Sequence, residues 1–207
     1  LTRPSPKPAK SPPTADRDRY SNRELSWLAF NRRVLEEATN PAHPLLERLR
    51  FLSICGSNLD EFFITRVAGL KGQQLRGIED LSIDGRTPTQ QLEAIAREAD
   101  ALVVAQQEEW IILRAKLAEA GLEVVGIGDL TVAEKQWLRD HFREQILPVL
   151  TPQAFDSAHP FPFISNGGFT MVFELERQVR RKREAITELL MIPGMLPRFV
   201  ALPRPGR

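Results

Sequence analysis

Residues 89–120 contain neither glycine nor proline, and this stretch constrains the fold more than any other part of the chain. Its apolar residues recur close to a period of 3.6, which predicts one long amphipathic helix, or two joined at a bend. Gly121 follows directly, and glycine is a typical helix end. So long a helix needs neighbours to cover its apolar stripe. That stripe comprises Leu92, Ile95, Ala99, Leu102, Val103, Trp110, Leu113 and Leu117.

Shorter helical patterns precede this stretch, separated by turn residues. The first begins near Ser21, which has the capping-box spacing to Glu24, although Ser26 is an alternative cap. The second begins at Pro44, because proline suits a first-turn position, and is expected to end at Gly56. With the helix that follows Gly56, the sequence predicts four helices joined by short connections, which is an all-helical bundle.

The segment GSNLDEFF at 56–63 places polar groups where the third helix is expected to start. Ser57 and Asp60 are interpreted as caps, because their side chains suit the free N–H groups and positive dipole end of a first turn. Capping explains Asn58 less well. Its amide both donates and accepts hydrogen bonds, which suits the edge of a nucleobase. From the residues alone, capping and ligand contact both stay open for Asn58.

The pattern changes after Gly121. Residues 122–125 are a candidate short strand, and a helix follows, capped by Thr131 paired with Glu134. Three segments rich in β-forming residues and bounded by glycine and proline then predict strands at 169–176, 186–193 and 198–203.

These patterns predict an α+β fold in three parts. Residues 1–19 are a Pro-rich tail expected to be disordered. Residues 20–121 form the helical N-terminal domain, and residues 122–207 begin a mixed α/β domain. The chain stops directly after its last predicted strand, so we expect this second domain to be truncated.

The charge balance excludes one class of partner. The chain has 28 Lys and Arg against 27 Asp and Glu, whereas a dedicated nucleic-acid binder usually carries a clear basic excess. A basic run at 177–184 is the local exception. It is interpreted as a solvated hairpin tip. The alternative is a contact for a polyanion through Arg180, Arg181, Lys182 and Arg183.

Catalytic signatures are missing from the sequence. It has no G-x-x-x-x-G-K-[ST] loop, and no G-x-G-x-x-G follows a strand. His43, His141 and His159 lie far apart and Cys55 is the single cysteine, so no zinc-ligand spacing occurs. We therefore expect neither catalytic residues nor a metal site in these 207 residues. No run approaches the ~18 apolar residues of a membrane-spanning helix.

Three longer segments are jointly familiar: ELSWLAFNRRVLEEA, PLLERLRFLSICGSNLDEFFITRVAGLK and LTPQAFDSAHPFPFISN. In this order they resemble the N-terminal portion of long-chain bacterial polyphosphate kinases, which polymerise polyphosphate from ATP. The resemblance runs from about residue 20 to residue 203. It implies a four-domain enzyme, of which this chain holds the helical N-terminal domain and the start of the head domain.

The resemblance also implies a function and a site. Such enzymes reversibly transfer the terminal phosphate of ATP to polyphosphate through a phosphohistidine. That histidine and the Mg²⁺ site lie in the C-terminal domains, so we expect no turnover from this chain alone. The family's N-domain nucleotide contact falls on the asparagine of the S-N-L-D-E-F motif, which is Asn58. Ser57 and Asp60 would then support the site as caps.

Further expectations follow from the same resemblance. It implies a homodimer assembled through the head domain. The cytoplasm is the expected location, with peripheral association at the inner membrane as a second expectation. No role is carried onto His159. Two other functions stay open from the residues: a stand-alone helical binding or scaffold module, and a polyanion-binding module.

Overall fold

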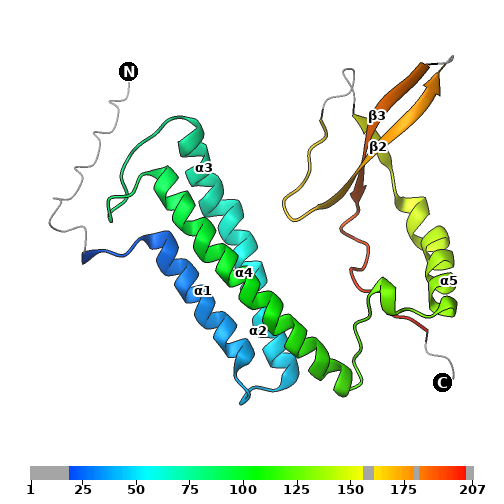
Figure 1. Ribbon diagram of the computed structural model, residues 1–207, viewed down its shortest axis with the longest axis horizontal. Coiled ribbons are helices and arrows are strands. Elements are labelled where there is room, and N and C mark those ends of the chain that lie inside the picture. Colours follow the sequence, from blue (N-terminus) through cyan, green and yellow to red (C-terminus); the bar gives the residue numbers. More distant parts are fainter. Residues whose placement is uncertain (1–18, 156–160, 180–181, 204–207) are drawn as a thin grey trace, which may run out of the picture. The chain divides into compact units, whose positions relative to one another are not determined.

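The computed structural model describes residues 19–155, 161–179 and 182–203. The chain divides into two units, residues 1–124 and 125–207. The predicted Pro-rich tail, apart from its last residue, lies outside the described residues. The predicted fold class is confirmed, because helices make up the first unit and a helix with a small antiparallel sheet makes up the second (Figure 1).

The first unit contains the helices α1 (Arg23–Thr39), α2 (Leu45–Phe62), α3 (Ala68–Leu75) and α4 (Pro88–Glu119). A π-helical segment, Phe63–Val67, joins α2 to α3 without a break. The Gly- and Pro-free stretch forms one helix, α4, which packs against α1, α2 and α3 (Figure 1). A capping box between Thr87 and Gln90 starts α4.

The cap of α1 is Asn22, so both predicted caps, Ser21 and Ser26, are wrong. The Asn22 Oδ1 accepts hydrogen bonds from the backbone N–H groups of Glu24 at 3.0 Å and Leu25 at 3.1 Å. Its Nδ2 donates to Asp84 Oδ1 at 3.1 Å and to Gln91 Oε1 at 3.2 Å. Asn22 is buried because it ties the start of α1 to the loop before α4 and to α4 itself.

Gly56 does not end a helix, in contrast to the prediction. It lies inside α2, and its φ is not positive as a left-handed helix end requires. Gly121, by contrast, has φ 83° and ends α4 as predicted. There the Leu122 N–H donates to the Leu117 carbonyl at 2.8 Å and the Gly121 N–H to the Ala118 carbonyl at 3.0 Å, the Schellman pattern.

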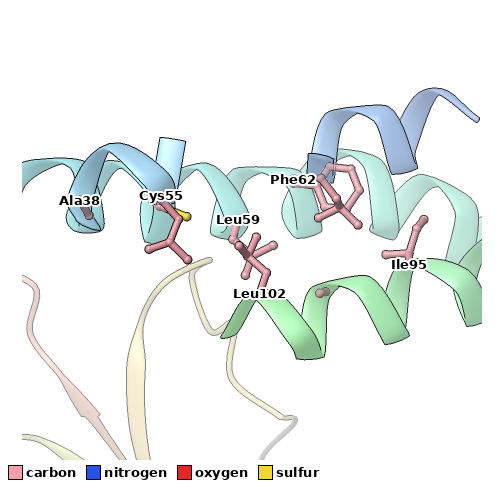
Figure 2. Close-up of a cluster of buried hydrophobic side chains, with 9 residues drawn as sticks. Ala38, Cys55, Leu59, Phe62, Ile95 and Leu102 are labelled. Atoms are coloured by element: carbon pink, nitrogen blue, oxygen red, sulfur yellow. The ribbon is translucent and has the colours of Figure 1, made fainter. Parts of the chain in front are cut away.

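The core of the first unit lies between α1, α2 and α4. Figure 2 shows Cys55, Leu59 and Phe62 of α2 gathered with Leu102 and Ile95 of α4. Because these α2 positions continue one apolar stripe across Gly56, burial of the stripe outweighs the ~1 kcal/mol helix penalty of that glycine. The cluster is completed by Leu28, Leu35, Ala38 and Ala99.

A buried ion pair crosses this unit. The Arg48 Nη2 lies 2.9 Å from Glu109 Oε1, and both side chains are less than a tenth exposed. The Arg48 Nε also donates to the Ala38 carbonyl at 2.7 Å. Since the guanidinium and carboxylate satisfy each other, α2 is joined to α4 in a fixed register.

The second unit contains α5 (Val132–His141), capped by the predicted Thr131–Glu134 box, and a three-stranded sheet. The strands β2 (Phe169–Val179) and β3 (Lys182–Ile192) confirm two predicted strands and form an antiparallel hairpin (Figure 1). An additional strand, β1 (Pro152–Phe155), pairs antiparallel with β3, so the order is β1-β3-β2.

Two predicted strands are wrong. Residues 122–125 and 198–203 have no strand structure. Both segments have β-forming residues, but neither has a partner strand, and isolated strands leave their backbone groups without ladder hydrogen bonds. The missed strand β1 begins at Pro152, which an edge strand tolerates because one side of it needs no ladder donor.

Candidate functional site

Asn58 lies in the interior of α2 and is half-buried. Ser57 and Asp60 also lie inside this helix and are exposed, so their predicted capping role is wrong. Both wrong caps follow from one wrong prediction, that a helix ends at Gly56. Because α2 continues through Gly56, the backbone N–H groups of the next residues bond within the helix and need no cap. Asn58 is therefore presented by a rigid helix interior and not by a capped end.

An open pocket of about 440 Å³ includes Asn58 in its wall. The other lining residues come from α1, from the end of α2 and from the π-helical segment: Trp27, Phe30, Glu61, Phe62, Thr65 and Arg66. The pocket thus combines aromatic rings with an amide, a hydroxyl and charges of both signs. Concave sites with this mixture are the default candidates for small-molecule binding.

The π-helical segment contributes two of these residues, Thr65 and Arg66. A π turn inserts one extra residue into the helix, which rotates the following side chains relative to a regular α-helix. The Thr65 Oγ1 donates to the Glu61 carbonyl at 2.7 Å, across the junction between α2 and the π-helical segment. Such π segments are frequent at functional sites, which supports this pocket as the candidate site.

Aromatic rings form one side of the pocket. Trp27 and Phe62 stack with ring centroids 4.5 Å apart and an interplanar angle of 9°. Phe62 is the buried ring of this pair, at 2% exposure, whereas Phe30 is 48% exposed. The Arg33 guanidinium lies 5.8 Å from the Phe30 ring centroid. A rigid inner stack with an accessible ring beside it can hold the face of a flat ligand.

A chain of hydrogen bonds runs from the pocket into the core. The Asn58 Nδ2 donates to Asn31 Oδ1 at 3.1 Å, and the Asn31 Nδ2 donates to the Cys55 carbonyl at 3.0 Å. Beyond it, the Gln106 Nε2 donates to Cys55 Sγ at 3.1 Å. Asn31 is completely buried. Burial raises the pKa of the Cys55 thiol, more than the Gln106 hydrogen bond lowers it, so the thiol is a packing group and not a nucleophile.

A second hollow of about 460 Å³ lies along α5 and the π-helical segment Phe142–Ile146. Trp137 and His141 stack there with centroids 5.0 Å apart. Glutamate, glutamine and aspartate side chains complete the lining. Because all the lining residues come from one helical stretch, this hollow is a helix surface and not a site built between elements.

The basic run lies at the end of the β2–β3 hairpin. Lys182 pairs in register with Val179, and Arg183 with Gln178. Arg180 and Arg181 lie outside the described residues, as does His159. The expected hairpin is confirmed, and the polyanion contact stays a prediction.

The described residues offer neither a metal-ligand cluster nor a membrane-spanning helix. They contain no group of three or more His, Cys, Asp and Glu side chains that could hold a metal ion. No helix in the same described part is long and apolar enough to cross a membrane.

Several site residues were missed by sequence reasoning. The predicted site residues include none of Trp27, Phe30, Asn31 and Phe62. An asparagine within a stripe of apolar neighbours is the signal that could have indicated Asn31, because buried polar groups need partners. Thr65 and Arg66 depend on the π turn, which no sequence pattern indicated.

Two family descriptions match the chain: the polyphosphate kinase N-terminal domain over residues 20–125 and the polyphosphate kinase middle domain over residues 133–207. The polyphosphate kinase of Erythrobacter litoralis is 55% identical over 192 residues, covering 93% of this chain and 26% of the relative. That of Prosthecochloris aestuarii is 46% identical over 186 residues, covering 88% and 26%.

A solved structure agrees with these relatives. The crystal structure of polyphosphate kinase from Porphyromonas gingivalis matches with a TM-score of 0.69 and 30% identity, over 89% of this chain and 26% of the other. The chain therefore spans about a quarter of the length of the relatives it matches.

Proposed function

The chain belongs to the polyphosphate kinase family, and from this premise we propose that its helical unit supplies one wall of an ATP site. In the proposal, the chain is the N-terminal helical domain and the start of the head domain of an enzyme that transfers the terminal phosphate of ATP to polyphosphate. The transfer is reversible and passes through a phosphohistidine, in which an imidazole takes the phosphoryl group as a nucleophile.

The observation that carries the proposal is the half-buried Asn58 amide in the wall of an aromatic pocket. The exposed Phe30 ring offers a stacking surface for a base, and the Asn58 amide offers hydrogen bonds to its edge. Arg66, in the same wall, adds a positive charge toward an anionic ligand. Together these groups suit a flat, polar-edged and negatively charged molecule, as a nucleotide is.

The reacting groups belong to the rest of the proposed enzyme. The described residues offer no metal-ligand cluster, so no step here runs through Mg²⁺, which the full-length enzyme would bind elsewhere. The 207-residue chain alone should therefore lack turnover, and magnesium-dependent polyphosphate synthesis by it would contradict this. A homodimer through the head domain, a cytoplasmic location and peripheral association at the inner membrane are also part of the proposal.

Asn58→Ala in the full-length enzyme tests the site. A lost neutral hydrogen bond of ~0.5–1.5 kcal/mol should raise the KM for ATP roughly two- to tenfold. The kcat should fall less, because a group that contacts the nucleotide away from the reacting phosphate binds ground and transition states alike. Steady-state kinetics with varied ATP measure both constants.

Ser57→Ala is the matched control. Ser57 is the exposed neighbour of Asn58 in the interior of α2 and does not line the pocket. Alanine has the higher helix propensity, so this change should leave both the melting temperature and the KM for ATP nearly unchanged. An unchanged KM in Asn58→Ala, with the fold intact by circular dichroism, would remove Asn58 from the site.

A further inference from the structure

The direction of each hydrogen bond in the Cys55–Asn31–Asn58 chain is chemically forced. A backbone carbonyl only accepts, so the Asn31 group 3.0 Å from the Cys55 oxygen is its NH₂. The opposite corner of the Asn31 amide, which meets Asn58 at 3.1 Å, is then its oxygen. An amide oxygen also only accepts, so Asn58 turns its own NH₂ toward Asn31. The Cys55 carbonyl thus sets the orientation of both amides.

The orientation of the Asn58 amide determines which of its groups can contact a ligand in the pocket. With one N–H directed at Asn31, Asn58 keeps its Oδ1 and its second N–H for a ligand. Among the described residues, no side chain or backbone group donates to that Oδ1. On its Watson–Crick edge, adenine presents an N6 amino donor beside the N1 acceptor, and an asparagine amide pairs with both at once. Guanine presents the inverted pattern on the same edge, an O6 acceptor beside an N1–H donor, so its O6 would face the Asn58 oxygen lone pairs.

We propose that Asn31 is a positioning residue that makes the pocket select adenine over guanine, an inference that rests on the proposed nucleotide contact of Asn58. A free asparagine amide can rotate by 180° and exchange its donor and acceptor, and would then serve either base. Asn31 removes that freedom because it is completely buried and itself held by the α2 backbone. The discrimination comes from the orientation of Asn58 and not from a contact of Asn31 with the base.

Asn31→Leu in the full-length enzyme tests this inference. Leucine is close to asparagine in shape and apolar, so it fits the site between Cys55 and the α1 core while removing the orienting oxygen. The unmodified enzyme should use ATP in preference to GTP by about tenfold or more in kcat/KM. In Asn31→Leu, the ratio of kcat/KM for ATP to that for GTP should fall roughly five- to tenfold, because Asn58 can turn to meet guanine.

Gln106→Met is the matched control. Gln106 is another buried amide of the first unit and contacts Cys55 from the side of α4, at 3.1 Å from its sulfur. It does not line the pocket and does not contact Asn58. Its replacement should lower stability to a similar degree but leave the ATP-to-GTP ratio unchanged. A ratio that falls equally in both variants would assign the effect to general loosening of the core and overturn the inference.

A second variant covers the case in which leucine is not tolerated. Asn31→Ser is smaller, and its rotating hydroxyl both donates and accepts, so it cannot fix the orientation of Asn58. The ratio should fall in this variant too. Equal use of ATP and GTP by the unmodified enzyme, or an unchanged ratio in a folded Asn31 variant, would overturn the inference. If Asn31 fails these tests but Asn58→Ala still raises the KM for ATP, the proposed nucleotide contact of Asn58 stands and only the role of Asn31 is lost. An unchanged KM for ATP in Asn58→Ala would overturn both the nucleotide contact and the role of Asn31.

Discussion

The two units of the molecule bury their apolar side chains to different extents. In the helical unit, long apolar residues of α1, α2 and α4 are nearly inaccessible, such as Leu102 at 1%. In the second unit, only Leu130 and Leu189 are buried hydrophobic residues among those described. Along β2, Phe169 is 67% and Val172 is 63% exposed. The helical unit encloses a core of its own, although side chains such as Leu75 and Ile111 stay exposed, whereas the described residues of the second unit enclose almost none.

The pattern along β2 sharpens this difference. Side chains two residues apart share one face of a strand, and Phe169, Met171, Phe173 and Leu175 all lie on one face of β2 and are all more than a third exposed. The second unit is held mainly by its strand ladder, and the first by a core. The candidate site belongs to the first unit, so its rigidity comes from side-chain packing that the unit provides by itself.

The largest expected effect separates the two units. A chain of residues 20–124 alone should keep its helical circular dichroism and unfold in one cooperative thermal transition, because its core is complete. A chain of residues 125–207 alone should melt broadly and bind a hydrophobic dye, because its apolar strand residues stay open to water. A sharp transition in the second chain, or none in the first, would show that the burial difference does not govern stability.

One substitution made in both units gives a smaller and more local contrast. Phe62→Ala removes a side chain with 2% exposure and should lower the free energy of unfolding by about 3–5 kcal/mol. It also removes the ring that stacks on Trp27. Phe169→Ala removes a mostly exposed ring and should cost less than about 1 kcal/mol. Urea unfolding followed by circular dichroism compares the two, and equal costs would contradict the comparison.

Most of the fold could be predicted from local pattern. The 3.6-residue period and Gly121 were sufficient to predict α4 and its end, because local propensity and tertiary packing favour the same structure there. At Gly56 they conflict. The glycine favours a helix end, but the stripe of Cys55, Leu59 and Phe62 is buried only if α2 continues, and packing decides. The strand errors at 122–125 and 198–203 have the same origin, because partner strands are not local information.

The candidate site could be predicted only in part. Asn58 came from a motif and a family resemblance, and the structure places it in an open pocket. The pocket itself depends on α1 lying beside α2, and on the π turn that exposes Thr65 and Arg66. Neither this packing nor the π turn can be predicted from a short stretch of sequence. The orienting role proposed for Asn31 depends on its hydrogen-bond partners, the Cys55 carbonyl and the Asn58 amide. The sequence alone shows neither these partners nor the direction of each hydrogen bond.

The smallest expected effect concerns the helix of the less buried unit. The Thr131 backbone N–H donates to Glu134 Oε2 at 2.8 Å, and the Thr131 hydroxyl donates to the same oxygen at 2.8 Å. The backbone hydrogen bond first, and then the hydroxyl, lower the pKa of Glu134 below its ordinary 4.5. A lowered pKa stabilises the folded state fully above the unfolded value, and this contribution is lost as the pH falls through the folded pKa.

Glu134→Gln should therefore loosen α5 at neutral pH but change little at low pH. Hydrogen exchange of the α5 backbone amides, compared between the two proteins at the same pH, isolates the effect because all other carboxylates titrate equally in both. The difference in protection should be present at pH 7 and should shrink progressively below pH 4.5. Amides of α4 should not respond, since its cap uses Thr87 and Gln90, which do not titrate. A difference that persists unchanged at low pH would mean that the charge of Glu134 contributes nothing to the start of α5.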